Sequence, residues 1–188
     1  MSNGFLFTRP LHGGAVLVPR TAAMAEPYHA ALVANQPRFA RWEPWAAEPP
    51  RLEHTRAFLA LSGQEWLAGR QLPVAIAVPG ADGAWAVAGS LGLRIDRAAA
   101  TGELGYWVDG AHEGRGLVRR AAEVLLAEAF GPLRLGRVLL GTAADNLRSR
   151  ALAERLGFTL DGVLPGAMAF AEGPRDKAVY SLRAPVRA

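Results

Sequence analysis

The chain has 188 residues, of which 51% are hydrophobic and 20% are charged, so it can bury a core, and we expect one compact domain over residues 1–188. It contains no cysteine, which excludes a disulfide scaffold, a thiolate metal site and a cysteine nucleophile. The formal net charge is +4, and Lys177 is the only lysine among the 21 lysines and arginines. Arginine binds phosphate through two parallel hydrogen bonds, and the arginines form no long tract. These charges therefore favour a phosphorylated small molecule over nucleic acid.

Neither a membrane span nor a targeting segment is expected. The longest nearly uncharged stretch, residues 71–93, contains prolines and glycines, so it predicts a hairpin and not a spanning helix. The first residues lack a basic region ahead of an apolar one, so we expect no signal peptide and a cytoplasmic location. No two histidines have the spacing of metal ligands on a helix, so no metal site is expected; the histidines are His12, His29, His54 and His112.

Turn residues and hydrophobic spacing divide the chain into strands and helices. In chain order, strands are expected at residues 14–19, 74–78, 84–95, 102–109, 137–144, 158–170 and 177–183, and helices at 22–35, 52–69, 117–130 and 146–156. The first helix is expected to end before Pro37, and the proline-rich segment 38–50 to form a loop. Gly157 is expected to cap the last helix, and residues 79–83 and 172–174 to form turns. The order predicts a mixed α/β fold whose sheet is largely antiparallel.

The segment after the strand 102–109 has the composition of a phosphate-binding loop. Gly114 and Gly116 allow the backbone to approach a ligand closely, and the helix that follows has free N–H groups and a positive dipole at its start. Arg115, Arg119 and Arg120 add positive charge. The pattern matches neither the dinucleotide motif, because position 119 is arginine, nor a P-loop. The alternative is an ordinary tight turn between a strand and a helix.

A second junction between a strand and a helix contains Asn146 and Ser149. Because the two residues are three apart, they share one face of the expected helix. The alternative is that Asn146 is only an N-cap and Ser149 an ordinary surface residue.

Together these segments resemble the GNAT acyl-CoA N-acyltransferases, and above all the RimJ/RimL-type subgroup that acetylates the N-termini of ribosomal proteins. The matching segments are residues 103–108 (ELGYWV), 114–118 (GRGLV), Asp145 and Asn146 with Ser149, 156–158 (LGF), 173–176 (GPRD), 179–182 (VYSL), and the region of Trp42 and Trp45 followed by 52–59. The resemblance extends from about Leu17 to Leu182. One departure is Ala111, where the family has glutamine or arginine, which removes one side-chain contact but not the backbone loop.

The resemblance implies a single GNAT domain with an α/β (α+β) fold. Its twisted, mostly antiparallel sheet has about seven strands, is flanked by about four helices and is splayed between the fourth and fifth strands. It also implies acetyl-CoA as co-substrate, with the pyrophosphate on residues 113–119 and the pantetheine arm in the splay, which a bulge in the strand 102–109 would open. The cofactor-binding residues are then Trp107, Val108, Glu113, Gly114, Arg115, Gly116, Leu117, Val118, Arg119, Asn146 and Ser149.

The implied chemistry is direct transfer, in which an amine attacks the thioester carbonyl. The Val108 N–H would stabilise the oxyanion, and Ser149 would protonate the departing sulfur as general acid. Glu103 is the first candidate for general base, directly or through water, and Asp109 the second. An α-amine, with a pKa of about 7.7–8.0 against about 10.4 for lysine, needs only a modest base.

Trp42, Glu43, Trp45 and Tyr106 are expected to bind the acceptor, although Trp42 and Trp45 could equally pin a proline-rich loop onto the domain. The leading hypothesis is an acetyl-CoA-dependent N-acetyltransferase that acts on the N-terminal α-amine of a protein, such as a ribosomal protein. The alternatives are an acetyltransferase for a small amine (an antibiotic, polyamine or amino acid) and a non-catalytic acyl-CoA-binding module. The resemblance slightly favours a homodimer over a monomer.

Overall fold

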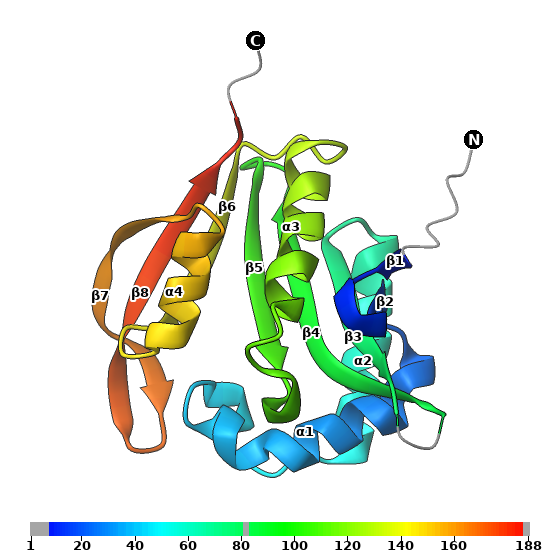
Figure 1. Cartoon of the computed structure of the whole chain (residues 1–188). Helices are drawn as coiled ribbons and strands as arrows, with labels where there is room; N and C mark the ends of the chain where they lie inside the picture. Colours follow the sequence, from blue (N-terminus) through cyan, green and yellow to red (C-terminus); the bar gives the residue numbers. More distant parts are fainter. Residues whose placement is uncertain (1–7, 81–82, 186–188) are drawn as a thin grey trace.

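The structure, a computed structural model, describes residues 8–80 and 83–185, which form one eight-stranded sheet with helices on both faces (Figure 1). The strands are β1 (Arg9–Pro10), β2 (Val16–Pro19), β3 (Gln71–Pro79), β4 (Trp85–Asp96), β5 (Thr101–Val108), β6 (Arg137–Ala143), β7 (Thr159–Phe170) and β8 (Gly173–Arg183). The helices are α1 (Ala25–Ala40), α2 (Leu52–Leu67), α3 (Leu117–Phe130) and α4 (Leu147–Arg155), with short 3-10 helices η1 (His12–Gly14), η2 (Ala22–Met24), η3 (Pro44–Ala46) and η4 (Gly110–His112).

The strand order is β1-β2-β3-β4-β5-β6-β8-β7, and only β5 and β6 are parallel neighbours. The mixed, mostly antiparallel fold with four α-helices is therefore confirmed, and the seven expected strands are all present as β2 to β8. The two-residue strand β1 was not expected. Part of the expected turn 79–83 lies outside the described residues, at positions 81 and 82. None of the helices in the described ranges is long and apolar enough to cross a membrane.

The first helix does not end before Pro37, as the sequence predicts, but continues to Ala40. A proline inside a helix removes one backbone hydrogen bond and costs about 3 kcal/mol. Here it lies in the last turn, and the extra turn buries Phe39 in the core and directs Arg38 toward Val108. Tertiary packing therefore outweighs the local preference.

The sheet is splayed between β5 and β6, which are the fourth and fifth of the expected strands. Their parallel pairing is confined to Thr101–Glu103 opposite Arg137–Leu139, whereas β6 stays paired with β8 as far as Ala143. The predicted bulge in the strand 102–109 is wrong, because β4 and β5 pair without a register shift from Gly89–Val108 to Asp96–Thr101. The two strands separate because their pairing simply ends. Register shifts occur instead between β3 and β4, where Ile76 pairs with Gly89 and Ala77 with Val87, and between β7 and β8.

Two hydrophobic clusters cover the two faces of the sheet. On the face that Figure 1 shows in front, α3 packs its buried stripe, including Ala121 and Leu125, against the strands. On the other face, α1 buries Tyr28 and Phe39 against Val87 of β4 and the ring of Trp107. The strand β5 therefore separates two differently built environments.

Candidate active site

A cleft of about 1960 Å³ includes the splay and is lined from both faces of the sheet. The residues from β5 are Glu103 to Val108, and β6 contributes Gly141 and Thr142. The structure brings together in this cleft the predicted site residues, with the exception of Asp109, Arg115 and Arg120. Those that line it are Trp42, Glu43, Trp45, Glu103, Tyr106, Trp107, Val108, Glu113, Gly114, Gly116, Leu117, Val118, Arg119, Asn146 and Ser149.

The glycines of the loop between β5 and α3 adopt the backbone conformation that favours this residue. Gly114 has a φ of 72° and Gly116 a φ of 70°, both in the left-handed region. Gly116 is the N-cap of α3, and no side chain accepts a hydrogen bond from the first turn of the helix at this cap. The free N–H groups of that turn therefore remain available to a ligand. The side chains of Leu117 and Val118 are buried, which means that these two residues can serve a ligand only through their backbone.

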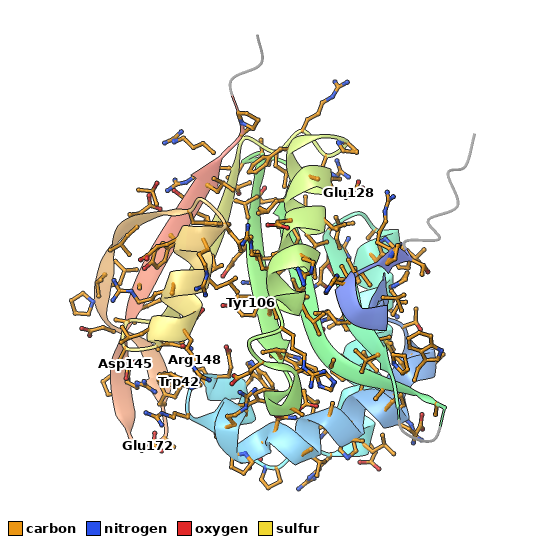
Figure 2. The ribbon with its side chains drawn as sticks, viewed as in Figure 1. Trp42, Tyr106, Glu128, Asp145, Arg148 and Glu172 are labelled. Carbon is orange, nitrogen blue, oxygen red and sulfur yellow. The ribbon has the colours of Figure 1, made fainter. Side chains whose placement is uncertain are left out.

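The acidic residue next to the glycines of this loop, Glu113, is held by arginines from two other elements. Arg38 on α1 contacts one of its carboxylate oxygens, and Arg148 on α4 donates to the other over 2.6 Å. Figure 2 shows Arg148 at the lower end of α4. The two guanidinium groups more than balance the carboxylate, so the mouth of the loop keeps a positive charge. Sequence reasoning missed Arg38 and Arg148 because neither is near the loop in the chain.

The hydroxyl groups of Ser149 and Tyr106 meet between α4 and β5, at a distance of 2.7 Å. Asn146 caps α4 by accepting a hydrogen bond from the Ser149 N–H (3.2 Å) and also lines the cleft. Burial raises the pKa of Tyr106 to about 12, so its phenol stays protonated at neutral pH. Tyr106 lies in the middle of the molecule in Figure 2. Ser149, only 9% exposed, thus has a hydrogen-bond partner that keeps its own proton.

Glu103 lies on the opposite face of β5 from Tyr106. Successive side chains of a strand alternate between faces, and the two residues are three apart. The Glu103 carboxylate forms an ion pair with Arg94, its partner across the β4–β5 ladder. The predicted acid and base therefore flank the strand, one on each side.

The second predicted base, Asp109, is engaged by the fold. It accepts hydrogen bonds from Asn35 (3.0 Å) and from the Ala111 N–H (3.2 Å), and His112 lies 3.2 Å away. Burial by itself raises the pKa of Asp109, but these hydrogen bonds outweigh it and leave the pKa below its ordinary value. Asp109 is also not among the residues that line the cleft.

The backbone N–H of Val108 points into the splay. The Asp109 N–H donates to the Ala88 carbonyl over 2.9 Å, which makes this position a hydrogen-bonded one of the β4–β5 ladder. In an antiparallel ladder, hydrogen-bonded pairs alternate with pairs whose N–H and C=O groups point away from the partner strand. The next pair, Gly89 with Val108, is of the second kind, so the N–H and C=O of Val108 face away from β4, toward the other edge of β5. The Val108 carbonyl on that edge accepts from Arg38, in agreement with this alternation. An N–H donor is therefore directed to the edge where β6 has departed.

The second wall of the cleft consists of aromatic side chains around η3. The Trp45 N–H donates to the Glu43 carboxylate over 3.0 Å, and the Trp45 ring lies 5.8 Å from that of Phe39. The guanidinium groups of Arg41 and Arg175 lie 4.8 Å and 5.1 Å from the centre of the Trp42 ring. Trp45 is 54% exposed, so the aromatics both pin the segment and face the cleft.

Trp107 has a mainly structural environment. Its ring lies 5.2 Å from that of Tyr28 and 5.3 Å from that of Phe39, and its N–H donates to the Tyr28 hydroxyl over 3.2 Å. Its predicted contact with a cofactor stays a prediction. In the described part of the chain, no group of three or more histidine, aspartate and glutamate side chains comes together as a metal site would need.

Comparison with known proteins identifies the family. The model of the acetyltransferase (GNAT) domain matches residues 15–159. The ribosomal-protein-serine acetyltransferase of Escherichia coli (strain K12) is 32% identical over 88 residues, which is 47% of this chain and 49% of that protein. The chain thus spans about half the length of the curated relatives it matches.

Two solved structures cover nearly the whole chain. The microcin C7 self-immunity acetyltransferase MccE, in complex with acetyl-CoA and AMP, has a TM-score of 0.81 at 25% identity, over 92% of this chain and 93% of that one. RimL, a ribosomal L7/L12 α-N-protein acetyltransferase in complex with coenzyme A, has a TM-score of 0.86 over 94% and 98% of the two chains. At 20% identity the likeness to RimL concerns the fold. With the family model matching from 15 to 159, the chain belongs to the GNAT acetyltransferase family.

Proposed function

We propose that this chain transfers an acetyl group from acetyl-CoA directly to a primary amine, and that the amine is the N-terminal α-amine of a protein, such as a ribosomal protein. The observation that carries the proposal is the splay between β5 and β6. It opens beside the glycine loop on one side and the Ser149–Tyr106 pair on the other.

The residues around the loop fit the phosphates of a coenzyme A thioester. The left-handed Gly114 and Gly116 and the free end of α3 supply N–H donors, and Arg119 and Arg148 supply exposed positive charge. The extended pantetheine arm carries amide groups, which could pair with the open edge of β5 as an added strand does. Acetyl-CoA supplies the activated acyl group, and the chain supplies its orientation.

The transfer then needs a donor at the oxyanion and an acid at the sulfur. The Val108 N–H is directed into the splay, where it can stabilise negative charge on the carbonyl oxygen. On the α4 side, the Ser149 hydroxyl can protonate the thiolate as it departs, and Tyr106 can orient that hydroxyl through their hydrogen bond. The amine would approach from the other face, where Glu103 and the wall around η3 lie.

The acceptor is proposed from the relatives and from the chemistry of that wall. The E. coli relative is a ribosomal-protein-serine acetyltransferase by name. The exposed aromatic rings of the η3 segment can cover an extended peptide, and the Glu43 carboxylate can receive its ammonium group. A cytoplasmic location and a homodimer stay predictions.

A second candidate is an amine on a small molecule. The similarity to MccE favours it, because that protein is an immunity acetyltransferase whose structure contains AMP together with acetyl-CoA. Substrate choice in such a cleft depends on the loops around it, so one scaffold can serve both acceptors.

The test is to incubate the purified protein with acetyl-CoA and a mixed pool of peptides with free N-termini and small amines. Mass spectrometry then identifies the products. We expect acetylated peptide α-amines, first among peptides that begin with alanine or serine. Acetylation of small amines alone would move the assignment to the second candidate. Tight binding of acetyl-CoA without any product from the whole pool would favour a non-catalytic binding module.

A further inference from the structure

We propose that Glu43, at the start of η3, is the general base that removes the proton from the acceptor ammonium group. The proposal rests on the proposed acetyl transfer and replaces Glu103 in that role. It follows from comparing the carboxylates that line the cleft, namely Glu43, Glu48, Glu103, Glu113 and Asp145.

The other carboxylates are either held by arginine or exposed. Glu103 is paired with Arg94, Glu113 with Arg38 and Arg148, and Asp145 with Arg175. A carboxylate in such a pair must give up its partner before it can accept a proton. Glu48 is exposed. Glu43 is the half-buried carboxylate of the cleft whose bonded partner is the neutral indole N–H of Trp45, at 3.0 Å.

No cation forms an ion pair with Glu43 within the described residues. Besides the carboxylates, titratable side chains line the cleft from the surrounding elements. They are Arg20, Tyr28, Arg38, Arg41, Arg51, His54, Arg94, Tyr106, His112, Arg119, Arg148, Arg155 and Lys177. Residues Ala167 to Ala169 of β7, the strand that packs against η3, carry no titratable group toward the cleft. The carboxylate is thus left free for a cation that comes with the substrate.

Packing holds Glu43 next to the reacting strand. The Trp45 ring lies tilted against that of Phe39, and the Phe39 ring lies tilted against that of Trp107, the neighbour of Tyr106 on β5. The negative charge of Glu43 acts on the Tyr106 phenol and contributes to raising its pKa. Glu43 therefore lies within electrostatic range of the Tyr106–Ser149 pair, with the splay and its oxyanion donor on the same strand.

The environment of Glu43 gives the carboxylate the basicity that the reaction needs. Burial raises its pKa to about 7, and the indole hydrogen bond offsets only part of this effect. An α-ammonium group has a pKa of about 7.7–8.0, so proton transfer to Glu43 is unfavourable by only about tenfold. For a lysine ammonium, at about 10.4, the same transfer is unfavourable by roughly 2,500-fold. The site is accordingly matched to an α-amine.

The protons and bonds of the step balance as follows. The acceptor –NH₃⁺ gives one proton to the Glu43 carboxylate, and the freed lone pair forms the C–N bond to the thioester carbonyl carbon. The C–S bond breaks as the intermediate collapses, and the sulfur takes a proton from Ser149. The nitrogen loses its second proton, which replaces the one that Ser149 gave. The proton on Glu43 passes to solvent.

The test compares the pH profiles of Glu43→Gln, Glu103→Gln and the matched control Glu48→Gln with that of the unchanged protein. The acceptor is a peptide that the unchanged protein acetylates. Glutamine keeps an oxygen for the Trp45 N–H but cannot take a proton. We expect Glu43→Gln to lower kcat by about 10²–10³-fold at pH 7. The deficit should shrink above pH 9, because the amine is then already neutral, and KM for acetyl-CoA should change little.

Glu48→Gln should behave like the unchanged protein. The rising limb of kcat/KM should move from about pH 7 to about pH 8 in Glu43→Gln alone. If Glu103→Gln moves this limb and Glu43→Gln does not, the proposal is overturned in favour of Glu103. A uniform loss at all pH values, with weaker acetyl-CoA binding, would show a structural role and also overturn it. An unchanged protein that binds acetyl-CoA and acetylates nothing would instead refute the proposed function itself.

Discussion

On one side of β5, the cleft is built from backbone: the glycine loop, the first turn of α3 and the open edge of the strand. On the other side it is built from side chains of the segment after α1, which aromatic contacts hold against Trp107. We call the first the backbone-built side: it presents backbone N–H groups whose positions are fixed by secondary structure. We call the second the side-chain-built side: it presents a carboxylate and indole rings whose positions depend on tertiary packing.

This difference separates two tasks. Acetyl-CoA is the same molecule for every member of a family that uses it, so a site made of backbone groups tolerates changes in side chains. The acceptor differs between enzymes, and a wall of loop side chains can change without disturbing the sheet. The predictions below ask whether the two sides can be damaged independently.

The largest effect is expected for Ser149→Ala, which removes the proposed acid on α4, on the side of β5 that faces the coenzyme. We expect kcat to fall by about 10²–10⁴-fold, as for the loss of a general acid, with the free energy of unfolding lowered by only about 1 kcal/mol for the lost bond to Tyr106. Steady-state kinetics and chemical denaturation measure the two quantities. Tyr106→Phe, which keeps the serine, should lose much less activity. A kcat within twofold of the unchanged protein would remove Ser149 from the mechanism.

For Trp107→Ala, on the side-chain-built side, we expect the main effect on stability and not on kcat. The ring fills the space between Tyr28 and Phe39, so its removal should lower the free energy of unfolding by about 3 kcal/mol. Trp85→Ala is the control, because that ring is 55% exposed, and it should cost less than about 1 kcal/mol. Equal effects of the two substitutions in urea denaturation would mean that the aromatic contacts do not hold the wall in place.

The same division explains what could be predicted from the sequence. The glycine loop, Asn146 and Ser149 are coded locally, by residues a few positions apart at the ends of strands, and all of them except Arg115 line the cleft. The extension of α1 past Pro37 was missed because burial of Phe39 outweighs the local cost of proline. The arginines that hold Glu113 come from α1 and α4, more than 30 positions away in the chain, and no local pattern indicates them. The environment of Glu43 likewise depends on packing.

A smaller effect is expected on stability through Glu43. Its pKa is raised to about 7 in the folded protein from an ordinary value of 4.5, so the folded state holds this proton more tightly than the unfolded state. Protonated Glu43 therefore stabilises the folded state fully below pH 4.5, and this contribution to the free energy of unfolding is lost as the pH rises through 7. Because the side chain is only partly buried, we expect a cost of about 2 kcal/mol at pH 8.

Glu43→Gln removes this cost, so its Tm should exceed that of the unchanged protein by about 5 °C at pH 8 and by little at pH 4.5. Thermal unfolding followed by circular dichroism at the two pH values measures the difference, with Glu48→Gln as control. A Tm difference that does not grow with pH would mean that the Glu43 carboxylate is not desolvated. If Glu43→Gln loses activity and gains stability, the Glu43 carboxylate serves catalysis at the expense of stability.

The smallest effect, expected for Gly116→Ala, tests the backbone-built side without touching a side chain of the cleft. A Cβ there would meet only Arg120 at 3.6 Å, an ordinary contact, so the cost of about 1 kcal/mol comes from the left-handed φ of 70°. Relief of that strain would turn the first N–H groups of α3 away from the phosphates, and we expect calorimetry to show acetyl-CoA binding weakened about fivefold. Gly63→Ala, in the open middle of α2, should instead stabilise the protein by about 0.5–1 kcal/mol and leave binding unchanged. Unchanged acetyl-CoA affinity in Gly116→Ala would mean that side-chain charge, and not backbone geometry, holds the phosphates.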